Sequence, residues 1–78
     1  MLIYDPKMKK VLYIDNQSKN NANATIQIFD AVGKLVKQVN SKSTGIVDID
    51  LNDVPAGVYM VMLRSNNKIV ASRKLLKE

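Results

Sequence analysis

The side chains of this 78-residue chain that could do chemistry are few in kind, because it contains no histidine and no cysteine. It therefore lacks the usual general base near neutral pH, the commonest nitrogen ligand of metals and any thiolate nucleophile. An enzyme would have to work with Asp, Glu, Lys, Tyr and Ser alone. We therefore expect no catalytic residue, no metal site and no cofactor, and we predict that the chain is not an enzyme.

The net charge of +5 raises the question of nucleic-acid binding. The cations are scattered singly along the chain, apart from the pairs Lys9-Lys10 and Arg73-Lys74. Aromatic residues make up 5% of the sequence, which is too few for base-stacking platforms. A solvated sheet whose lysines discourage edge-to-edge aggregation explains the same charges. We predict no nucleic-acid partner and no membrane span.

The element that organises the chain is its longest apolar run, residues 58–63, which follows a turn. Pro55 sets the φ angle of the turn and Gly57 tolerates the conformation that ends it. A run this short, bounded by turn residues, predicts a strand buried on both faces. Because side chains alternate, one face carries Tyr59, Val61 and Leu63 and the other carries Val58, Met60 and Met62. Tyr59 is expected to fill the core.

The other predicted strands are short and lie between polar segments. Period-two alternation turns Ile26 and Ile28 inward, and likewise Val47, Ile49 and Leu51. In the second strand we expect Leu12 and Ile14 to face inward. Polar residues 7–10, 15–23 and 40–45 are expected to form connections. The predicted strands are residues 2–4, 11–14, 24–29, 34–39, 46–51, 58–63 and 68–76.

Two of the connections have the sequence of a tight hairpin. Asp30 and Gly33 frame a type I turn with glycine in the left-handed position, followed by a one-residue bulge, and Lys34 begins the returning strand. Asn66-Asn67 forms a two-residue turn that needs positive φ. Seven strands at this spacing predict an all-β fold, a small antiparallel immunoglobulin-like β-sandwich, with residues 1–78 forming a single domain.

Three segments together resemble a known family. Residues 26–36 (IQIFDAVGKLV) resemble the I-x-I-Y-D-x-x-G-K-x-V hairpin of the C-terminal sorting domains of the type IX (Por) secretion system, and they carry Asp30, Gly33 and Lys34. Residues 51–61 (LNDVPAGVYMV) look like that family's L-x-x-L-x-x-G-x-Y-x-V segment. Residues 68–75 are similar to its closing strand, which ends in Lys-Leu. The opening departs from the family, because Tyr-Asp-Pro-Lys at residues 4–7 replaces a Tyr-Pro-Asn-Pro-like element.

The resemblance implies a secretion signal of Bacteroidetes-type bacteria. Such a domain is the tail of a longer secreted protein and follows an N-terminal cargo domain. The outer-membrane export machinery recognises the tail and brings the cargo from the periplasm to the cell surface, where a sortase removes the tail in many cases. We expect recognition at an edge or face of the last two strands, with Lys74, Leu75, Met60 and Met62 as candidate contacts.

Three alternatives remain open at this stage. The first is an adhesive or carbohydrate-binding accessory β-sandwich, although such modules use exposed aromatic residues and this chain has only four aromatics. The second is self-association through Met60 and Met62, because an uncovered apolar face favours pairing. The third concerns Lys74 alone, which is either a solvated charge or a docking contact.

Overall fold

The computed structural model describes residues 2–14, 24–41, 46–65 and 67–78, and in them the chain forms strands and turns without a helix. No segment of this described part is a helix that could cross a membrane. The strands within it are β1 (Leu2–Asp5), β2 (Lys10–Ile14), β3 (Ala24–Phe29), β4 (Leu35–Ser41), β5 (Ile46–Asp50), β6 (Gly57–Ser65) and β7 (Lys68–Lys77).

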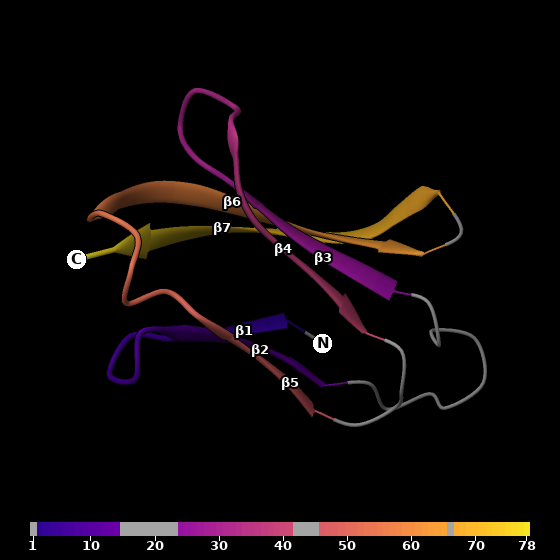
Figure 1. Ribbon diagram of the computed structural model, residues 1–78, viewed down its shortest axis with the longest axis horizontal. Helices are drawn as coiled ribbons and strands as arrows, with labels where there is room; N and C mark the ends of the chain where they lie inside the picture. Colours follow the sequence, from indigo (N-terminus) through magenta and orange to yellow (C-terminus); the bar gives the residue numbers. More distant parts are fainter. Residues whose placement is uncertain (1, 15–23, 42–45, 66) are drawn as a thin grey trace.

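The strands form two antiparallel sheets that lie one above the other (Figure 1). The order is β1-β2-β5 in the first sheet and β4-β3-β6-β7 in the second. This arrangement confirms the predicted immunoglobulin-like β-sandwich. Because β4 pairs with β3 rather than with β5, the second sheet is the larger one, and β1 and β7 lie at the edges of their sheets.

The space between the sheets is filled by the inward side chains of both layers. As predicted, Ile26 and Ile28 are fully buried. Ile49 and Leu51 are also buried as predicted and belong to the same core cluster. The core also contains Leu2, Val11, Tyr13, Ala24, Val54, Tyr59, Val61, Leu63 and Leu75, with Tyr4, Val36, Val39, Val47 and Ala71 packed against it. Each apolar side chain of this size that leaves water contributes about 1.5–3 kcal/mol.

The inward face of β2 is the opposite of the predicted one. Val11 and Tyr13 are buried at 2% exposure, whereas Leu12 is only half-buried and the side chain of Ile14 lies outside the described set. All four residues of this run are apolar, so the alternation had no polar residue to mark the solvent side. The pairing decides it, because Val11 lies opposite buried Ile49 of β5.

Strand β6 is covered on one face only, which corrects the prediction of burial on both. Tyr59, Val61 and Leu63 face the core as expected. On the other face Val58 is exposed, and Met60 and Met62 are half-buried beside neighbouring strands of their own sheet. No third layer covers this face in the described part of the chain.

Several connections differ slightly from their predicted limits. Lys10 already belongs to β2, and β4 continues through Ser41, where a turn was expected. β4 begins at Leu35, one residue later than predicted. The predicted loop at residues 15–23 and the rest of the turn at 42–45 lie outside the described residues. In the last hairpin Asn67 has the expected positive φ of 65°, whereas Asn66 is also outside them.

Candidate recognition site

Three segments that are distant in sequence meet on the outer face of the four-stranded sheet. They are the β3–β4 hairpin tip, the start of β6 and the end of β7. Together they line a hollow of about 250 Å³ formed by Asp30, Ala31, Val58, Tyr59, Met60 and Lys74. A second hollow of about 210 Å³ adjoins it and extends to Val32, Ala56 and Gly57. We call these two hollows the outer-face pocket.

The register of the sheet determines which side chains reach this pocket. Met60 of β6 lies opposite Lys74 of β7 on one side and opposite Phe29 of β3 on the other. Val58 lies opposite Leu76. This end of the outer face is therefore apolar, with one ammonium group beside it.

The other end of the same face is polar. Arg64 Nε donates to Gln27 Oε1 at 2.8 Å, and Gln27 Nε2 donates in turn to Gln38 Oε1 at 2.9 Å. Thr25 Oγ1 donates to Asn40 Oδ1 at 3.2 Å beside them. The polar groups at this end already hydrogen-bond to one another. We therefore look for the partner-binding surface at the apolar end of the face.

The hairpin tip that borders the pocket is held by Asp30. Its Oδ1 accepts hydrogen bonds from the main-chain nitrogens of Val32 and Lys34 at 3.1 and 2.8 Å. The nitrogen of Gly33 donates to the Asp30 carbonyl at 3.0 Å, and Gly33 has a φ of +88°. The nitrogen of Asp30 also donates to the Lys34 carbonyl at 2.9 Å, which agrees with the predicted type I turn and its one-residue bulge. The Asp30 carboxylate is thus a structural acceptor.

The turn before β6 is held by Tyr59. Its hydroxyl donates to the carbonyl oxygen of Pro55 at 2.5 Å, while its ring lies in the core. A tyrosine at the start of this strand that bonds back to the preceding turn is the tyrosine corner of immunoglobulin-like sandwiches. Gly57, between them, has a φ of +156°, which side-chain-bearing residues rarely adopt.

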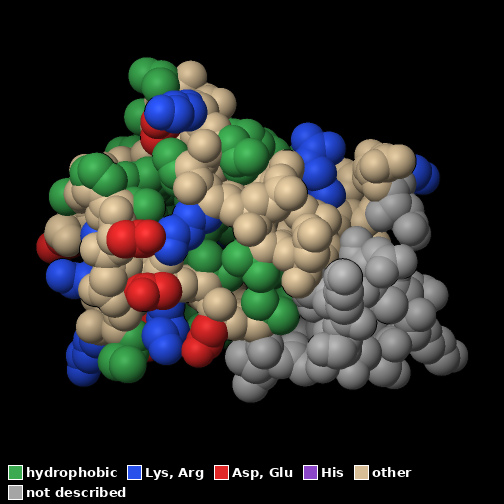
Figure 2. All heavy atoms as spheres, viewed as in Figure 1, with side chains coloured by type: hydrophobic (Ala, Val, Ile, Leu, Met, Phe, Trp, Pro, Cys, Tyr) green, Lys and Arg blue, Asp and Glu red, His purple; other side chains and the backbone are tan. Residues whose placement is uncertain are grey.

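Two carboxylates before this turn have lowered pKa values. The main-chain and side-chain nitrogens of Asn52 donate to Asp50 Oδ1 at 2.9 and 2.7 Å, and these hydrogen bonds lower the pKa of Asp50. Lys37 Nζ lies 2.7 Å from Asp53 Oδ1, and its hydrogen bond lowers the pKa of Asp53. Figure 2 shows acidic and basic side chains adjoining at the end of the molecule where β5 connects to β6.

Several cations hold the two sheets together rather than facing a partner. Lys37 of β4 donates to the Asp50 carbonyl at the end of β5. Arg73 Nη2 of β7 donates to the Leu2 carbonyl of β1 at 3.1 Å, and the buried Lys77 donates to the Val54 carbonyl.

Lys74 differs from these neighbours on its strand. It is exposed, and within the described part of the chain it makes no ion pair or side-chain hydrogen bond. Its charge is therefore available to a partner.

The structure brings together some of the predicted site residues and separates others. Met60 and Lys74 line the outer-face pocket with Asp30 and Tyr59, and Gly57 borders its extension. Met62 lies one pair farther along β6, opposite Ser72.

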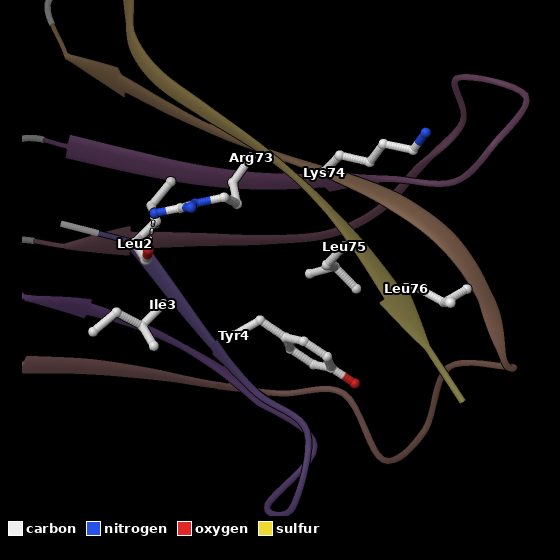
Figure 3. A pocket seen from close by; sticks show the side chains of 7 residues that line it. All are labelled: Leu2, Ile3, Tyr4, Arg73, Lys74, Leu75 and Leu76. Atoms are coloured by element: carbon white, nitrogen blue, oxygen red, sulfur yellow. Dashed lines mark hydrogen bonds between the residues drawn. The ribbon is translucent and has the colours of Figure 1, made fainter.

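The remaining predicted residues lie elsewhere. Leu75 points between the sheets and is 5% exposed, so only a small part of its side chain lines the groove between β7 and β1 (Figure 3). Lys34 and Gly33 belong to the hairpin tip, and Pro55 to the β6 turn, without lining the pocket.

The roles of Arg73 and Lys77 were not predicted from the sequence. For Lys77 a signal existed, because it lies two residues after buried Leu75 and so shares the inward face of β7. For Arg73 none existed, because its acceptor is 71 positions away.

The site has an apolar surface and few polar groups. Its polar groups are one free ammonium and one carboxylate that is already hydrogen-bonded. In the residues that the structure describes, no group of His, Cys, Asp and Glu could hold a metal ion. None of the four aromatic side chains, all of them in the described part, is exposed: Tyr13 and Tyr59 are buried, and Tyr4 and Phe29 are half-buried. A stacking platform for sugars is thus missing from this part of the chain.

Comparison with known proteins gives one clear result. The family model described as "Secretion system C-terminal sorting domain" matches residues 5–78, which is almost the whole chain. The match includes the hairpin, turn and closing-strand motifs that meet at the outer-face pocket. No curated protein matches the chain.

Proposed function

Because the chain belongs to the secretion system C-terminal sorting domain family, it is a sorting signal of the type IX system, and we propose that the export machinery recognises it through the outer-face pocket. Proteins with such tails are exported through the outer membrane and are released or kept at the cell surface. The tail is attached to an N-terminal cargo and interacts with the export machinery. The family is not known for catalysis.

The observation that carries the proposal is the convergence of three sequence motifs on one small surface. The hairpin, the turn before β6 and the end of β7 each supply residues to the pocket. Two of the motifs also have a structural role, since Asp30 and Tyr59 hold their own turns. Lys74 lacks such a role in the described part, and so it is our first candidate for a direct contact.

The proposed contact combines apolar burial with one charge. Val58 and Met60 provide an apolar floor, and methionine adapts to irregular partners because its side chain is flexible and polarisable. Lys74 adds an ammonium at the rim, which favours an acidic group on the receptor. Met62 extends the same face, so the contact surface is expected to continue along β6.

Export of a reporter protein fused to this tail tests the proposal. Lys74→Glu is expected to lower the exported fraction by about tenfold, because it reverses the free charge at the rim. Lys7→Glu is the matched control, since it reverses an exposed charge in the β1–β2 turn, away from β7. Equal export of the two variants would contradict the proposed site while leaving the sorting function intact.

Point variants serve better here than removal of residues 73–78. Such a deletion also removes Leu75 and Lys77, whose side chains are buried, and would unfold the tail. Met60→Ser and Met62→Ser then measure how far the contact extends along β6. Loss of export in Met60→Ser, with normal folding by circular dichroism, supports recognition through the outer-face pocket.

The remaining proposals concern the whole protein. We propose that residues 1–78 act as one domain behind a secreted cargo, and that a surface sortase separates the two after export. Mass spectrometry of the surface-exposed cargo tests this step. Cargo that still carries the tail would show that separation does not occur.

A further inference from the structure

One side of the sandwich is open where two edge strands of different sheets meet. β1 is the edge of the three-stranded sheet and β7 the edge of the four-stranded sheet. Between them lies a groove of about 390 Å³ lined by Leu2, Ile3, Tyr4, Arg73, Lys74, Leu75 and Leu76. Figure 3 shows Tyr4 and Leu75 in this groove, with Lys74 directed away from it.

The backbone of β1 has hydrogen-bonding groups on the groove side. The Leu2 carbonyl accepts from Arg73, so the main-chain groups of Leu2 point toward β7 and not toward β2. Because these groups alternate along an antiparallel strand, those of Tyr4 point the same way.

The charges of β7 indicate what kind of segment the edge accepts. Residues 68–77 contain four cations and no acidic residue. Arg73 and Lys77 are already bound to carbonyl oxygens of the other sheet or its connection. Lys68 and Lys74 are exposed and have no ion pair within the described part of the chain. An unpaired strand edge with two free ammonium groups is complementary to an acidic strand.

We propose that β7 binds, by strand addition at its free edge, an extended acidic segment of a partner protein in which apolar and acidic side chains alternate. Its apolar side chains enter the groove, and its carboxylates lie on the outer face of the sheet, where Lys74 lies opposite Met60. A strand rises about 3.3 Å per residue, so the part of β7 that lines the groove spans about 10 Å, which accommodates two alternate side chains. Main-chain hydrogen bonds supply affinity, as in other strand additions.

A second copy of the chain fits this edge less well than an acidic partner. Residues 68–77 of each copy would bring four cations and no acidic residue to an antiparallel pair of two β7 strands. Like charges directly opposite each other destabilise a strand pair. An acidic strand instead brings carboxylates to this cationic edge.

This inference deepens the proposed function and rests on it, because it takes the partner to belong to the export machinery. Its test does not depend on export. The purified 78-residue chain, labelled with ¹⁵N, is titrated at low salt with a ten-residue peptide of alternating Val and Glu. Shifts are expected at amides of β7 and of Leu2 to Tyr4. The counterpart with Lys in place of Glu is expected to bind about tenfold more weakly.

Other outcomes of the titration overturn the proposal. These are equal binding of the two peptides, shifts confined to β4 at the opposite edge, or no shift at millimolar peptide. Light scattering that shows a dimer whose formation removes the β7 shifts would assign the edge to a second copy. Normal export of a tail that does not bind the peptide would reject strand addition and leave the sorting function standing.

A pair of variants at the groove rim separates charge from packing. Ile3 lines the groove and is partly exposed, so either charged replacement is compatible with folding. Ile3→Glu and Ile3→Lys remove the same apolar contact but introduce opposite charges. The acidic peptide is expected to bind Ile3→Lys about tenfold more tightly than Ile3→Glu. Equal affinities, with both variants folded by circular dichroism, contradict an acidic occupant.

Discussion

The hydroxyl of Tyr59 donates a hydrogen bond to the carbonyl oxygen of Pro55, four residues earlier, at 2.5 Å. This bond connects a side chain that fills the core to the turn that precedes β6. Because Gly57 and Val58 lie between its two ends, the bond also sets the position of the outer-face pocket. Core packing and the candidate recognition surface are thus coupled through one side chain.

Replacing Tyr59 by Phe tests this coupling. The ring stays, but the Pro55 carbonyl loses its donor in a partly buried place, so we expect a loss of about 1–2 kcal/mol in the free energy of unfolding. Urea denaturation measures it. Tyr4→Phe is the matched control, since the hydroxyl of Tyr4 makes no hydrogen bond within the described residues. Equal losses in the two variants would mean that the Tyr59 bond contributes nothing of its own.

The left-handed conformation of Gly33 leads to a second prediction. A methyl group at this position would meet no atom within 4 Å, so strain in the backbone alone sets the cost of Gly33→Ala. At a φ of +88° we expect a loss of about 1–2 kcal/mol in unfolding free energy. Gly33→Asn is expected to lose less, because asparagine tolerates this region. A thermal melt in which Asn is as damaging as Ala would contradict the prediction.

The pKa values of Asp50 and Asp53 predict how stability depends on pH. Both pKa values are lowered in the folded state, Asp50 mainly by the Asn52 main-chain hydrogen bond and Asp53 mainly by Lys37. A carboxyl with a lowered pKa stabilises the fold above its unfolded value, near 3.8, and loses this contribution as pH falls through the folded value. Stability is therefore expected to stay level down to about pH 5 and then to decline.

The matched variants for this pH prediction are Asp53→Asn and Glu78→Gln. Each removes one carboxylate, but Glu78 makes no ion pair within the described residues. Urea titrations at neutral and acidic pH are expected to show a shallower decline for Asp53→Asn than for Glu78→Gln. Parallel curves for the two variants would show that Lys37 does not stabilise the fold through Asp53.

Two lysines of β7 are expected to differ in their contribution to the stability of the fold. Lys77→Ala removes a buried side chain and the donor to the Val54 carbonyl, and should cost about 1–3 kcal/mol in unfolding free energy. Lys74→Ala, at an exposed position, should change it by less than about 0.5 kcal/mol. Chemical denaturation of both variants checks this. A large loss for Lys74→Ala would make it a structural residue and weaken its role in recognition.

Much of the fold follows from local signals that the sequence carries openly. Strands such as β3 and β5 alternate polar and apolar residues, so their inward faces could be predicted. The turn at Asp30 to Gly33 is specified by side-chain chemistry within four residues. The same local motifs carry the family resemblance, which is why the function could be predicted before the structure was known.

Other features depend on contacts between residues far apart in the sequence. The inward face of β2 could not be predicted, because four apolar residues leave the alternation unmarked until Val11 pairs with Ile49. The sequence also could not show whether the Lys74 ammonium group has a partner within the chain. This became clear only when folding brought Arg73 to Leu2 and Lys77 to Val54, leaving Lys74 without a partner in the described part of the chain.

By itself the sequence determined the strands, the tight turns and the kind of protein, because period-two patterns and turn residues act over a few neighbouring positions. The tertiary structure alone decided that β3 also pairs with β6, that β6 keeps one uncovered face and that β1 and β7 leave an open groove. Those features depend on strand pairing and on which charges meet across the two sheets. Both are set by long-range contacts that no short segment encodes.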